Sequence, residues 1–208
     1  MFGDHPYLRE KMHMVTDVTM EEYYYPSQNF QWPSSDLKLW IMNSFESWGA
    51  GYNTADVKGE PHTWAPYYMT ISVNVSGQTF GQLTRADGLG GTGVLWKNYW
   101  QNVGSPLNLV PGQWNKIKYR LKLNDLGQNN GLFQLWINDA LKCDYSNMNF
   151  RGNYSKYGWN HLMMSMHANP SHPQSQWVSR DNIQIVRDEI SIDSTRPPSP
   201  PGGLTIIR

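Results

Sequence analysis

Four basic side chains recur at every second position within residues 111–125, "PGQWNKIKYRLKLND". They are Lys116, Lys118, Arg120 and Lys122, and apolar or aromatic residues stand between them. Side chains of a β-strand alternate between its two faces, so this spacing predicts a strand with one cationic and one apolar face. A row of cations fits two structures: a strand face open to water, or the floor of a groove that binds an acidic polymer. In a groove, the Arg120 guanidinium would hold a carboxylate through two hydrogen bonds.

The charge balance of the whole chain limits what such a strand binds. Lys plus Arg number 17, Asp plus Glu also number 17, and the formal net charge is 0. Proteins that bind nucleic acid through its phosphates usually carry an excess of basic residues, so nucleic acid is disfavoured as a partner. No apolar stretch approaches the roughly 20 residues that cross a bilayer, so a membrane partner is disfavoured as well.

Aromatic side chains are frequent and are of the types that bind sugars. The chain has 10 Trp and 12 Tyr beside 6 Phe. Trp and Tyr combine a flat apolar ring with a polar edge, and sugars present C–H faces and hydroxyl edges that match both. Large β folds also bury many aromatic residues, so a single Trp does not distinguish the two roles. The total favours sugar binding.

Runs of alternating apolar and polar residues, separated by turn signals, predict an all-β chain. In "YYMTISVNVSG", Tyr67, Met69, Ile71, Val73 and Val75 alternate with Tyr68 and polar residues. No helical stretch of convincing length appears, and Gly and Pro are spread throughout. We therefore predict a two-sheet antiparallel β-sandwich. Further strands are expected in "VTDVTMEEYYY", "LKLWIMN", "LFQLWIND", "HLMMSMHAN" and "DNIQIVRDEISI".

The cationic strand and the run that follows it are predicted to form a hairpin. The stretch between them, "NDLGQNNG", is a polar turn rich in Asn and Gly. The run "LFQLWIND" then places Phe133, Leu135 and Ile137 on one face and Gln134 and Trp136 on the other. If the two strands pair, Gln134 and Trp136 lie beside the cations.

The run "HLMMSMHAN" carries two of the six His residues on one face. His161 and His167 share that face with Met163 and Ser165. The buried face is predicted to consist of Leu162, Met164 and Met166. A single strand His more often makes a structural hydrogen bond than performs chemistry, and both roles stay open for this pair.

The chain is predicted to be one domain, residues 1–195, followed by a Pro-rich linker or the start of a further module at 196–208. A length of 208 residues suits a single all-β domain. The start has no apolar core of a signal peptide, so the chain either begins after such a segment or belongs to a cytosolic protein. Cys143 is the only cysteine, which excludes an intrachain disulfide.

Three stretches carry a family pattern: "EEYYYPSQNFQWPSSDLKLWIMN", "LVPGQWNKIKYRLKLNDLGQNNGLFQLWINDALKCDYSNMNFR" and "RDNIQIVRDEISI". Together they resemble the concanavalin-like jelly-roll polysaccharide lyases of the alginate-lyase and glucuronan-lyase type. The middle stretch is the most specific, and its matching residues are Gly112, Trp114, Asn124, Asn130, Gly131, Trp136 and Asn138. The resemblance covers roughly residues 18 to 192. It implies a jelly roll, a monomer, an anionic polysaccharide partner and a location outside the cell or in the periplasm.

A second similarity concerns the site. "GQLTR" followed by "LWKNYWQN" is similar to the Gln-containing strand and the Lys/Tyr/Gln strand of jelly-roll alginate lyases. The sequence departs from that family at two points: Thr84 and Arg85 stand where a His would follow Gln82, and an Arg-x-Glu-x-Arg strand is absent. The residues at matching positions are Gln82, Lys97, Tyr99 and Gln101.

The implied reaction, β-elimination of a uronic-acid polymer, needs three groups. A cation or amide neutralises the C5 carboxylate, a base removes the C5 proton, and an acid protonates the leaving oxygen. The expected catalytic residues are Lys118, Arg120, Tyr99 and His167. The expected substrate-binding residues are Gln82, Arg85, Lys97, Gln101, Gln134 and Trp136.

A non-catalytic carbohydrate-binding module of a larger secreted protein is the alternative, because the pattern recurs in sugar-binding relatives without activity. No cofactor is obligatory for the elimination, and no residue spacing matches a zinc site. The resemblance allows a structural calcium, with Asp125 and Asp181 as candidate ligands. Glycoside hydrolysis is disfavoured, because the strand acids do not show the paired-carboxylate arrangement that the reaction needs.

Overall fold

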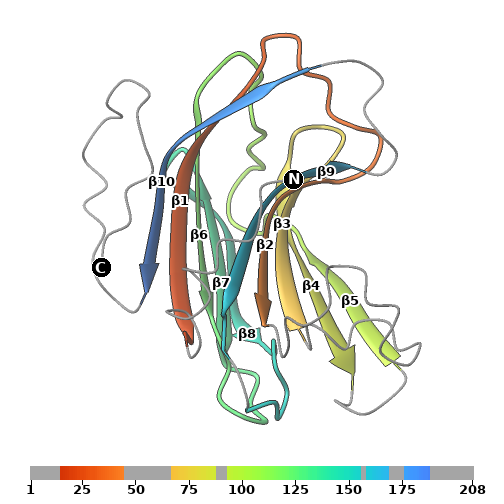
Figure 1. The fold of residues 1–208 in the computed structure, drawn as a ribbon, viewed down its shortest axis with the longest axis vertical. Coiled ribbons are helices and arrows are strands. Elements are labelled where there is room, and N and C mark those ends of the chain that lie inside the picture. Colours follow the sequence, from red (N-terminus) through yellow and green to blue (C-terminus); the bar gives the residue numbers. More distant parts are fainter. Residues whose placement is uncertain (1–14, 45–66, 88–92, 156–157, 169–175, 188–208) are drawn as a thin grey trace.

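The computed structural model describes residues 15–44, 67–87, 93–155, 158–168 and 176–187. These residues form ten β-strands, and no helix occurs among them (Figure 1). The strands are β1 (Asp17–Pro26), β2 (Leu37–Ser44), β3 (Tyr67–Val73), β4 (Thr79–Asp87), β5 (Gly93–Tyr99), β6 (Asn115–Lys122), β7 (Gly131–Ile137), β8 (Ala140–Met148), β9 (His161–Ala168) and β10 (Val178–Arg187).

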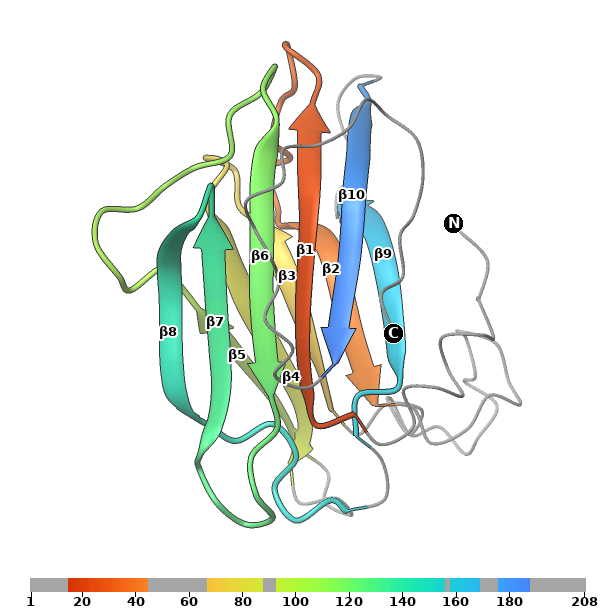
Figure 2. The same ribbon diagram turned by 90° about the vertical axis from the view of Figure 1, so that its left-hand side faces the viewer.

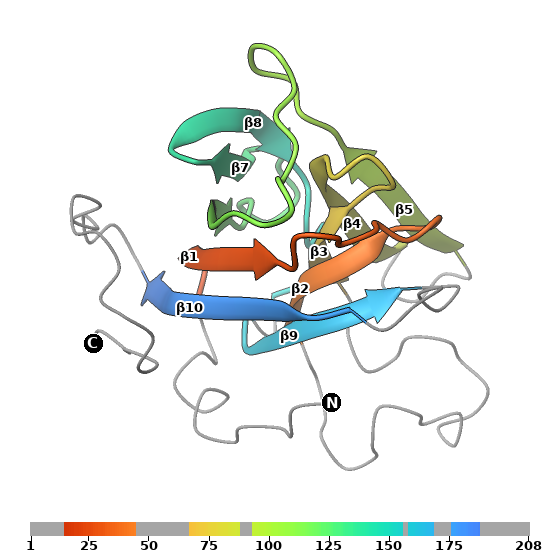
Figure 3. The same ribbon diagram turned by 90° about the horizontal axis from the view of Figure 1, so that it is seen from above.

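Two antiparallel sheets of five strands make up the sandwich. Sheet 1 has the order β10-β1-β6-β7-β8 and faces the viewer in Figure 2. Sheet 2 has the order β5-β4-β3-β2-β9, and Figure 3 shows the two sheets from above as separate layers. The predicted all-β, two-sheet antiparallel sandwich is confirmed. No helix in the described ranges is long and apolar enough to cross a membrane.

The apolar face of each central strand points toward the opposite sheet. In sheet 1, Ile117, Tyr119 and Leu121 of β6 are buried in the core. In sheet 2, Met69 and Ile71 of β3 belong to the same core. Burial of such side chains removes apolar area from water at about 25 cal/mol per Å². The alternation predicted from the sequence is confirmed for β6 and for β3 as far as Val73. It was wrong for Val75, which lies in the turn after β3 and is 62% exposed, because the strand ends before it.

Gly81 of β4 shows how closely the two sheets approach each other. A Cβ at this position would lie 2.6 Å from a ring carbon of Phe133 in β7, so no larger residue fits without a shift of the neighbours. Gly81 therefore points into the core. Its neighbour Gln82 must then point away from sheet 1, because successive side chains of a strand take opposite sides.

β6 and β7 form the predicted hairpin. Lys118 lies opposite Trp136, and Arg120 lies opposite Gln134 in the antiparallel register. Phe133, Leu135 and Ile137 are fully buried, and Gln134 and Trp136 are on the other side. The hairpin thus places the aromatic residue and the amide beside the cations, as predicted.

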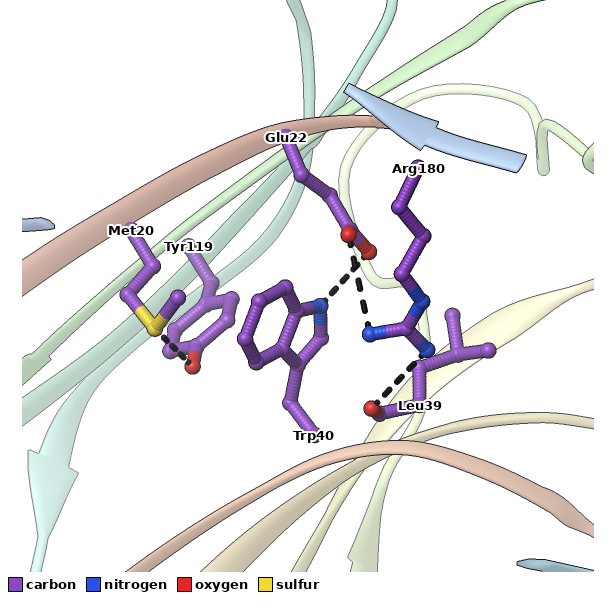
Figure 4. Close-up of polar contacts among 6 residues, drawn as sticks. All are labelled: Met20, Glu22, Leu39, Trp40, Tyr119 and Arg180. Carbon is purple, nitrogen blue, oxygen red and sulfur yellow. Dashed lines mark hydrogen bonds and ion pairs between the residues drawn. The ribbon is translucent and has the colours of Figure 1, made fainter. Parts of the chain in front are cut away.

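A buried polar cluster joins the two sheets (Figure 4). Glu22 of β1 is 1% exposed and accepts a 2.7 Å hydrogen bond from Trp40 Nε1 of β2. Arg180 of β10 lies 3.7 Å from the Glu22 carboxylate and donates to the Leu39 carbonyl at 3.1 Å. Its guanidinium also lies over the ring of Trp40, 5.0 Å from the centroid. Burial raises the pKa of Glu22, and Arg180 and the Trp40 hydrogen bond oppose that rise.

Some predictions concern parts of the chain outside the described residues. The domain boundary at 195 and the linker at 196–208 belong to these parts. The side chains of Met166 and His167 also lie outside what is described, although both residues belong to β9. Leu162 and Met164 pack against the core as predicted.

Candidate functional site

The cationic stripe lies on the outer face of sheet 1, the side that points away from sheet 2. Two of its members, Arg120 and Lys116, contact carboxylates of neighbouring segments. Arg120 donates from Nε and Nη2 to the two carboxylate oxygens of Asp17, at 3.0 and 2.6 Å. Lys116 is 5% exposed and lies 3.3 Å from Glu21 and 2.8 Å from Asp139. Burial by itself would lower the pKa of Lys116, but the hydrogen bond and charge of Asp139 and the charge of Glu21 raise it overall.

The other polar residues of this face also have protein partners. The Lys118 ammonium lies over the Trp136 ring, 5.0 Å from its centroid. Gln134 donates a 3.1 Å hydrogen bond to the carboxylate of Asp144. The face is therefore a water-facing strand surface whose charges are largely balanced within the protein. This pairing within the protein favours the first of the two structures that fit a row of cations, the strand face open to water.

Tyr99 lies between the sheets. It is 8% exposed and packs edge-on against Tyr145, with ring centroids 5.0 Å apart. Burial raises the pKa of its hydroxyl, which makes Tyr99 a poor base at neutral pH. Lys118 and Arg120 lie on the outer face of sheet 1, so these three expected catalytic residues do not meet in one cleft. The physical reason is register: Tyr99 pairs with Gly81, the inward-pointing position of β4.

Three of the expected substrate-binding residues make contacts at the edge of the sandwich instead. Gln101 donates to the carbonyls of Thr79 and Leu107 and accepts from the Leu107 backbone N–H at 2.7 Å, so its amide holds a loop. Arg85 donates to the Asn149 carbonyl at 2.8 Å. Lys97 is exposed, and its ammonium lies 5.2 Å from the Tyr99 ring centroid. These three side chains therefore contact loops and the edge of the sandwich.

The outer face of sheet 2 brings together residues with different chemistry. Residues that pair in register on successive strands form rows that run across the sheet. We number these rows from the end of β9 at which His161 lies. Row 1 consists of His161, Asn43, Tyr68, Thr84 and Trp96. Row 2 consists of Met163, Ile41, Thr70, Gln82 and Asn98. Row 3 continues with His167, Lys38, Ser72 and Phe80.

His161 and Asn43 form the most specific pair in row 1. The Asn43 side-chain amide lies 3.1 Å from His161 Nδ1. With the amide N–H as donor, Nδ1 accepts, and the ring proton of the neutral imidazole resides on Nε2. In this tautomer Nε2 of His161 is a hydrogen-bond donor. Tyr68 pairs with Asn43 from the other side, two strand spacings or about 10 Å from His161.

Buried hydroxyls line the same face without partners among the described residues. Thr70 is 0% and Thr84 is 2% exposed, and the Oγ1 of each has no hydrogen-bond partner there. The side-chain oxygen of Asn43 is in the same situation. Leaving such a group unsatisfied costs about 1–3 kcal/mol.

Amides and exposed rings complete this face at its β5 edge. Gln82 Nε2 donates to Asn98 Oδ1 at 3.0 Å. Trp96 is 54% exposed in row 1. Trp100, which follows β5, stacks on Phe80 with ring centroids 4.3 Å apart. Of the expected substrate-binding residues, Gln82 is the one that the structure places on this face together with His161.

Sequence reasoning did not single out Asn43, Tyr68, Asn98 or Trp96 as site residues. Alternation did place Tyr68 on the outward side of its strand and His161 on the same side as His167. The missing information was the strand order, because β2 joins β9 across more than 100 residues of chain. Spacing within one strand does not reveal its neighbours.

The described residues contain no group of three or more His, Cys, Asp or Glu side chains arranged to hold a metal. Asp125 accepts a 2.7 Å hydrogen bond from Asn130, and Asp181 accepts one from the Asn182 backbone at 2.8 Å. Both candidate calcium ligands therefore have partners within the protein.

Residues 97–185 match the model of polysaccharide lyase family 14. This range runs from within β5 to within β10 and includes the stripe and His161. No sequence relative was found among curated proteins. The resemblance to jelly-roll polysaccharide lyases is confirmed.

Solved structures show the same fold at low sequence identity. An alginate lyase from a Chlorella virus has a TM-score of 0.64 and 14% identity, over 83% of this chain and 72% of that one. A marine alginate lyase from Aplysia kurodai has a TM-score of 0.61 and 13% identity, over 84% and 71%. An endo-β-1,4-glucuronan lyase from the fungus Trichoderma reesei has a TM-score of 0.59 and 13% identity, over 83% and 69%. At this identity the likeness establishes the fold, a lyase-type jelly roll.

Proposed function

We propose that this protein is a polysaccharide lyase that cleaves an acidic, uronic-acid-containing polysaccharide by β-elimination on the outer face of sheet 2. The observation that carries the proposal is the Asn43–His161 pair, 3.1 Å apart, on the same face as the Gln82–Asn98 amides. The match to polysaccharide lyase family 14 and the alginate-lyase and glucuronan-lyase neighbours support the reaction class.

In the reaction, a base removes the C5 proton, and its electron pair forms the C4–C5 double bond. The C4–O bond of the glycosidic link breaks, and the leaving oxygen takes a proton. The Nε2–H of His161 suits hydrogen bonding to the C5 carboxylate, where negative charge grows in the transition state. The amides of Gln82 and Asn98 lie three and four strands away from β9 and suit a different sugar unit of the polymer. Tyr68 serves as the acid–base group of row 1. No co-reactant is needed to balance the step.

The polymer is proposed to lie across the strands along row 1. Trp96, at the β5 end, is roughly 19 Å from His161 by strand spacing, a distance that several sugar units span. Its exposed ring would stack on a sugar. Lys38, which pairs in register with His167 in row 3, extends the polar surface. A location outside the cytoplasm is part of the same proposal.

The test is incubation of the protein with alginate, glucuronan and a heparin-like polymer, followed by the ultraviolet absorbance of the unsaturated product. Absorbance that rises with time on at least one polymer supports the proposal. Silence on the whole panel, with a correctly folded protein, would sink it. The alternative, a non-catalytic carbohydrate-binding module, predicts retention of the protein in gels that contain a polymer, without any absorbance change.

A further inference from the structure

Three aromatic rings form a cluster on the outer face of sheet 1, which we call the aromatic platform: Tyr25, Trp114 and Trp177. Trp177 is 58% and Trp114 is 44% exposed. The rings of Tyr25 and Trp177 are nearly parallel, with an interplanar angle of 11° and centroids 5.7 Å apart. Trp114 meets Tyr25 edge-on at 5.3 Å. Large apolar side chains that stay exposed together mark a binding surface more often than scattered ones do.

The platform comes from three adjacent strand ends that are fixed to one another. Tyr25 belongs to β1, Trp114 directly precedes β6 and Trp177 directly precedes β10; these strands lie side by side in Figure 2. The Trp177 carbonyl accepts a 3.0 Å hydrogen bond from the Ser27 backbone, and the Gly112 N–H donates to the Pro26 carbonyl at 2.8 Å. The rings are therefore preorganised, which reduces the entropy that a ligand must overcome.

The surroundings of the platform are polar and offer no unpaired Lys or Arg on β1 or β6 next to it. Gln28 and Gln113, close in sequence to Tyr25 and Trp114, are exposed. The cation next to the platform on the same face, Lys116, is 5% exposed and is held by Glu21 and Asp139. Asp181 pairs with Tyr23 on this face and adds a carboxylate, which disfavours an acidic ligand. Exposed rings near amides, with the nearest cation already paired, suit an uncharged ligand with C–H faces and hydroxyl edges.

We propose that the aromatic platform is a second carbohydrate-binding site, which holds a neutral polysaccharide by stacking on Trp177 and Trp114. It lies on the opposite outer face of the sandwich from row 1. It would attach the protein to an uncharged glycan while the face of sheet 2 acts on an acidic one. The proposal concerns binding alone and does not depend on the elimination reaction.

Native affinity electrophoresis in gels that contain hydroxyethylcellulose or konjac glucomannan tests the platform. We expect at least one of these neutral polymers to retard the native protein. Trp177→Ala and Trp114→Ala should each weaken that retention about tenfold, because a stacking ring is lost. Raising the salt concentration from about 0.05 to about 0.5 M should leave the retention unchanged, since no charge pair is involved.

Trp96→Ala is the matched control, because it removes an equally exposed Trp from the other outer face. It should leave retention by neutral polymers unchanged and lower turnover of the acidic polymer. Thermal unfolding of all three variants checks that they are folded.

Three results would overturn the platform: no retention of the native protein by either neutral polymer, unchanged retention in both platform variants, or retention abolished by salt. A concentration-dependent dimer that is lost in Trp177→Ala would identify a second copy of the chain as the occupant and would also overturn it. Failure of the lyase assay leaves the retention result readable, so the two proposals fail separately.

Discussion

The two outer faces of the sandwich show the same alternation of side chains, but their polar groups differ in the partners that they have within the protein. On sheet 1, Arg120 donates from Nε and Nη2 to the two carboxylate oxygens of Asp17, and Lys116 contacts two carboxylates. On sheet 2, buried hydroxyls of Thr70 and Thr84 have no partner among the described residues, and His161 meets a neutral amide. Cations that are already paired within the protein have little left to offer an acidic substrate.

The largest effect is expected at His161. His161→Ala should lower kcat/KM on the acidic polymer by about 100- to 10,000-fold, the range typical of a group that hydrogen-bonds or transfers a proton in the transition state. Initial rates of ultraviolet absorbance measure it. Unfolding by denaturant should show little change, because the side chain is only partly buried. A rate within threefold of the native value would contradict the assignment of the active site to row 1.

The Glu22–Arg180 pair is buried between the two sheets. Breaking it should lower the stability of the fold without acting directly on either outer face. Arg180→Met leaves the carboxylate of Glu22, which is 1% exposed, without its charge partner. We expect the unfolding free energy to fall by about 3–5 kcal/mol, as measured by urea denaturation. The double variant Glu22→Gln/Arg180→Met should recover part of this loss. At low temperature the folded Arg180→Met protein should keep its turnover; selective loss of activity would show that the pair belongs to the site.

The pH dependence of stability gives a smaller test of the same pair. Burial raises the pKa of Glu22 in the folded protein above its ordinary value of about 4.3. The folded state therefore favours the protonated form, and this stabilisation, complete below about pH 4, is lost as pH rises through the folded-state pKa. Glu22→Gln lacks this loss. Compared with the variant, the native protein should become progressively less stable over this range. Parallel stability curves for the two proteins would contradict the expected shift.

The smallest effect is expected at Arg120. The groove interpretation of the stripe predicts a tenfold loss of acidic-glycan binding or turnover in Arg120→Ala. The Asp17 pairing predicts a change within about twofold and a stability cost of at most about 1 kcal/mol, typical of a partly exposed ion pair. Kinetics on the acidic polymer together with denaturation decide between them. Asp17→Asn should cost about the same stability, since it breaks the same pair; a tenfold kinetic loss in Arg120→Ala alone would restore the stripe as a binding surface.

The fold and the sidedness of its strands could be predicted from the sequence. Alternation in β3, β6 and β7 assigned Ile71, Tyr119 and Leu135 to the core, and an Asn- and Gly-rich turn predicted the β6–β7 hairpin that places Lys118 beside Trp136. These features depend on neighbours in the chain, and local backbone geometry determines them.

Which polar side chains become neighbours on each outer face was decided only by the tertiary structure. Arg120 and Asp17 are 103 residues apart in the sequence, and Asn43 and His161 are 118 apart. Alternation predicts that Arg120 points away from the core. The identity of its carboxylate partner depends on β1 lying next to β6. In the same way, Tyr99 was assigned to a site by local similarity, and its pairing with Gly81 turned it into the core. Strand order follows from the burial of the whole apolar core at once, and no short stretch of sequence contains that information.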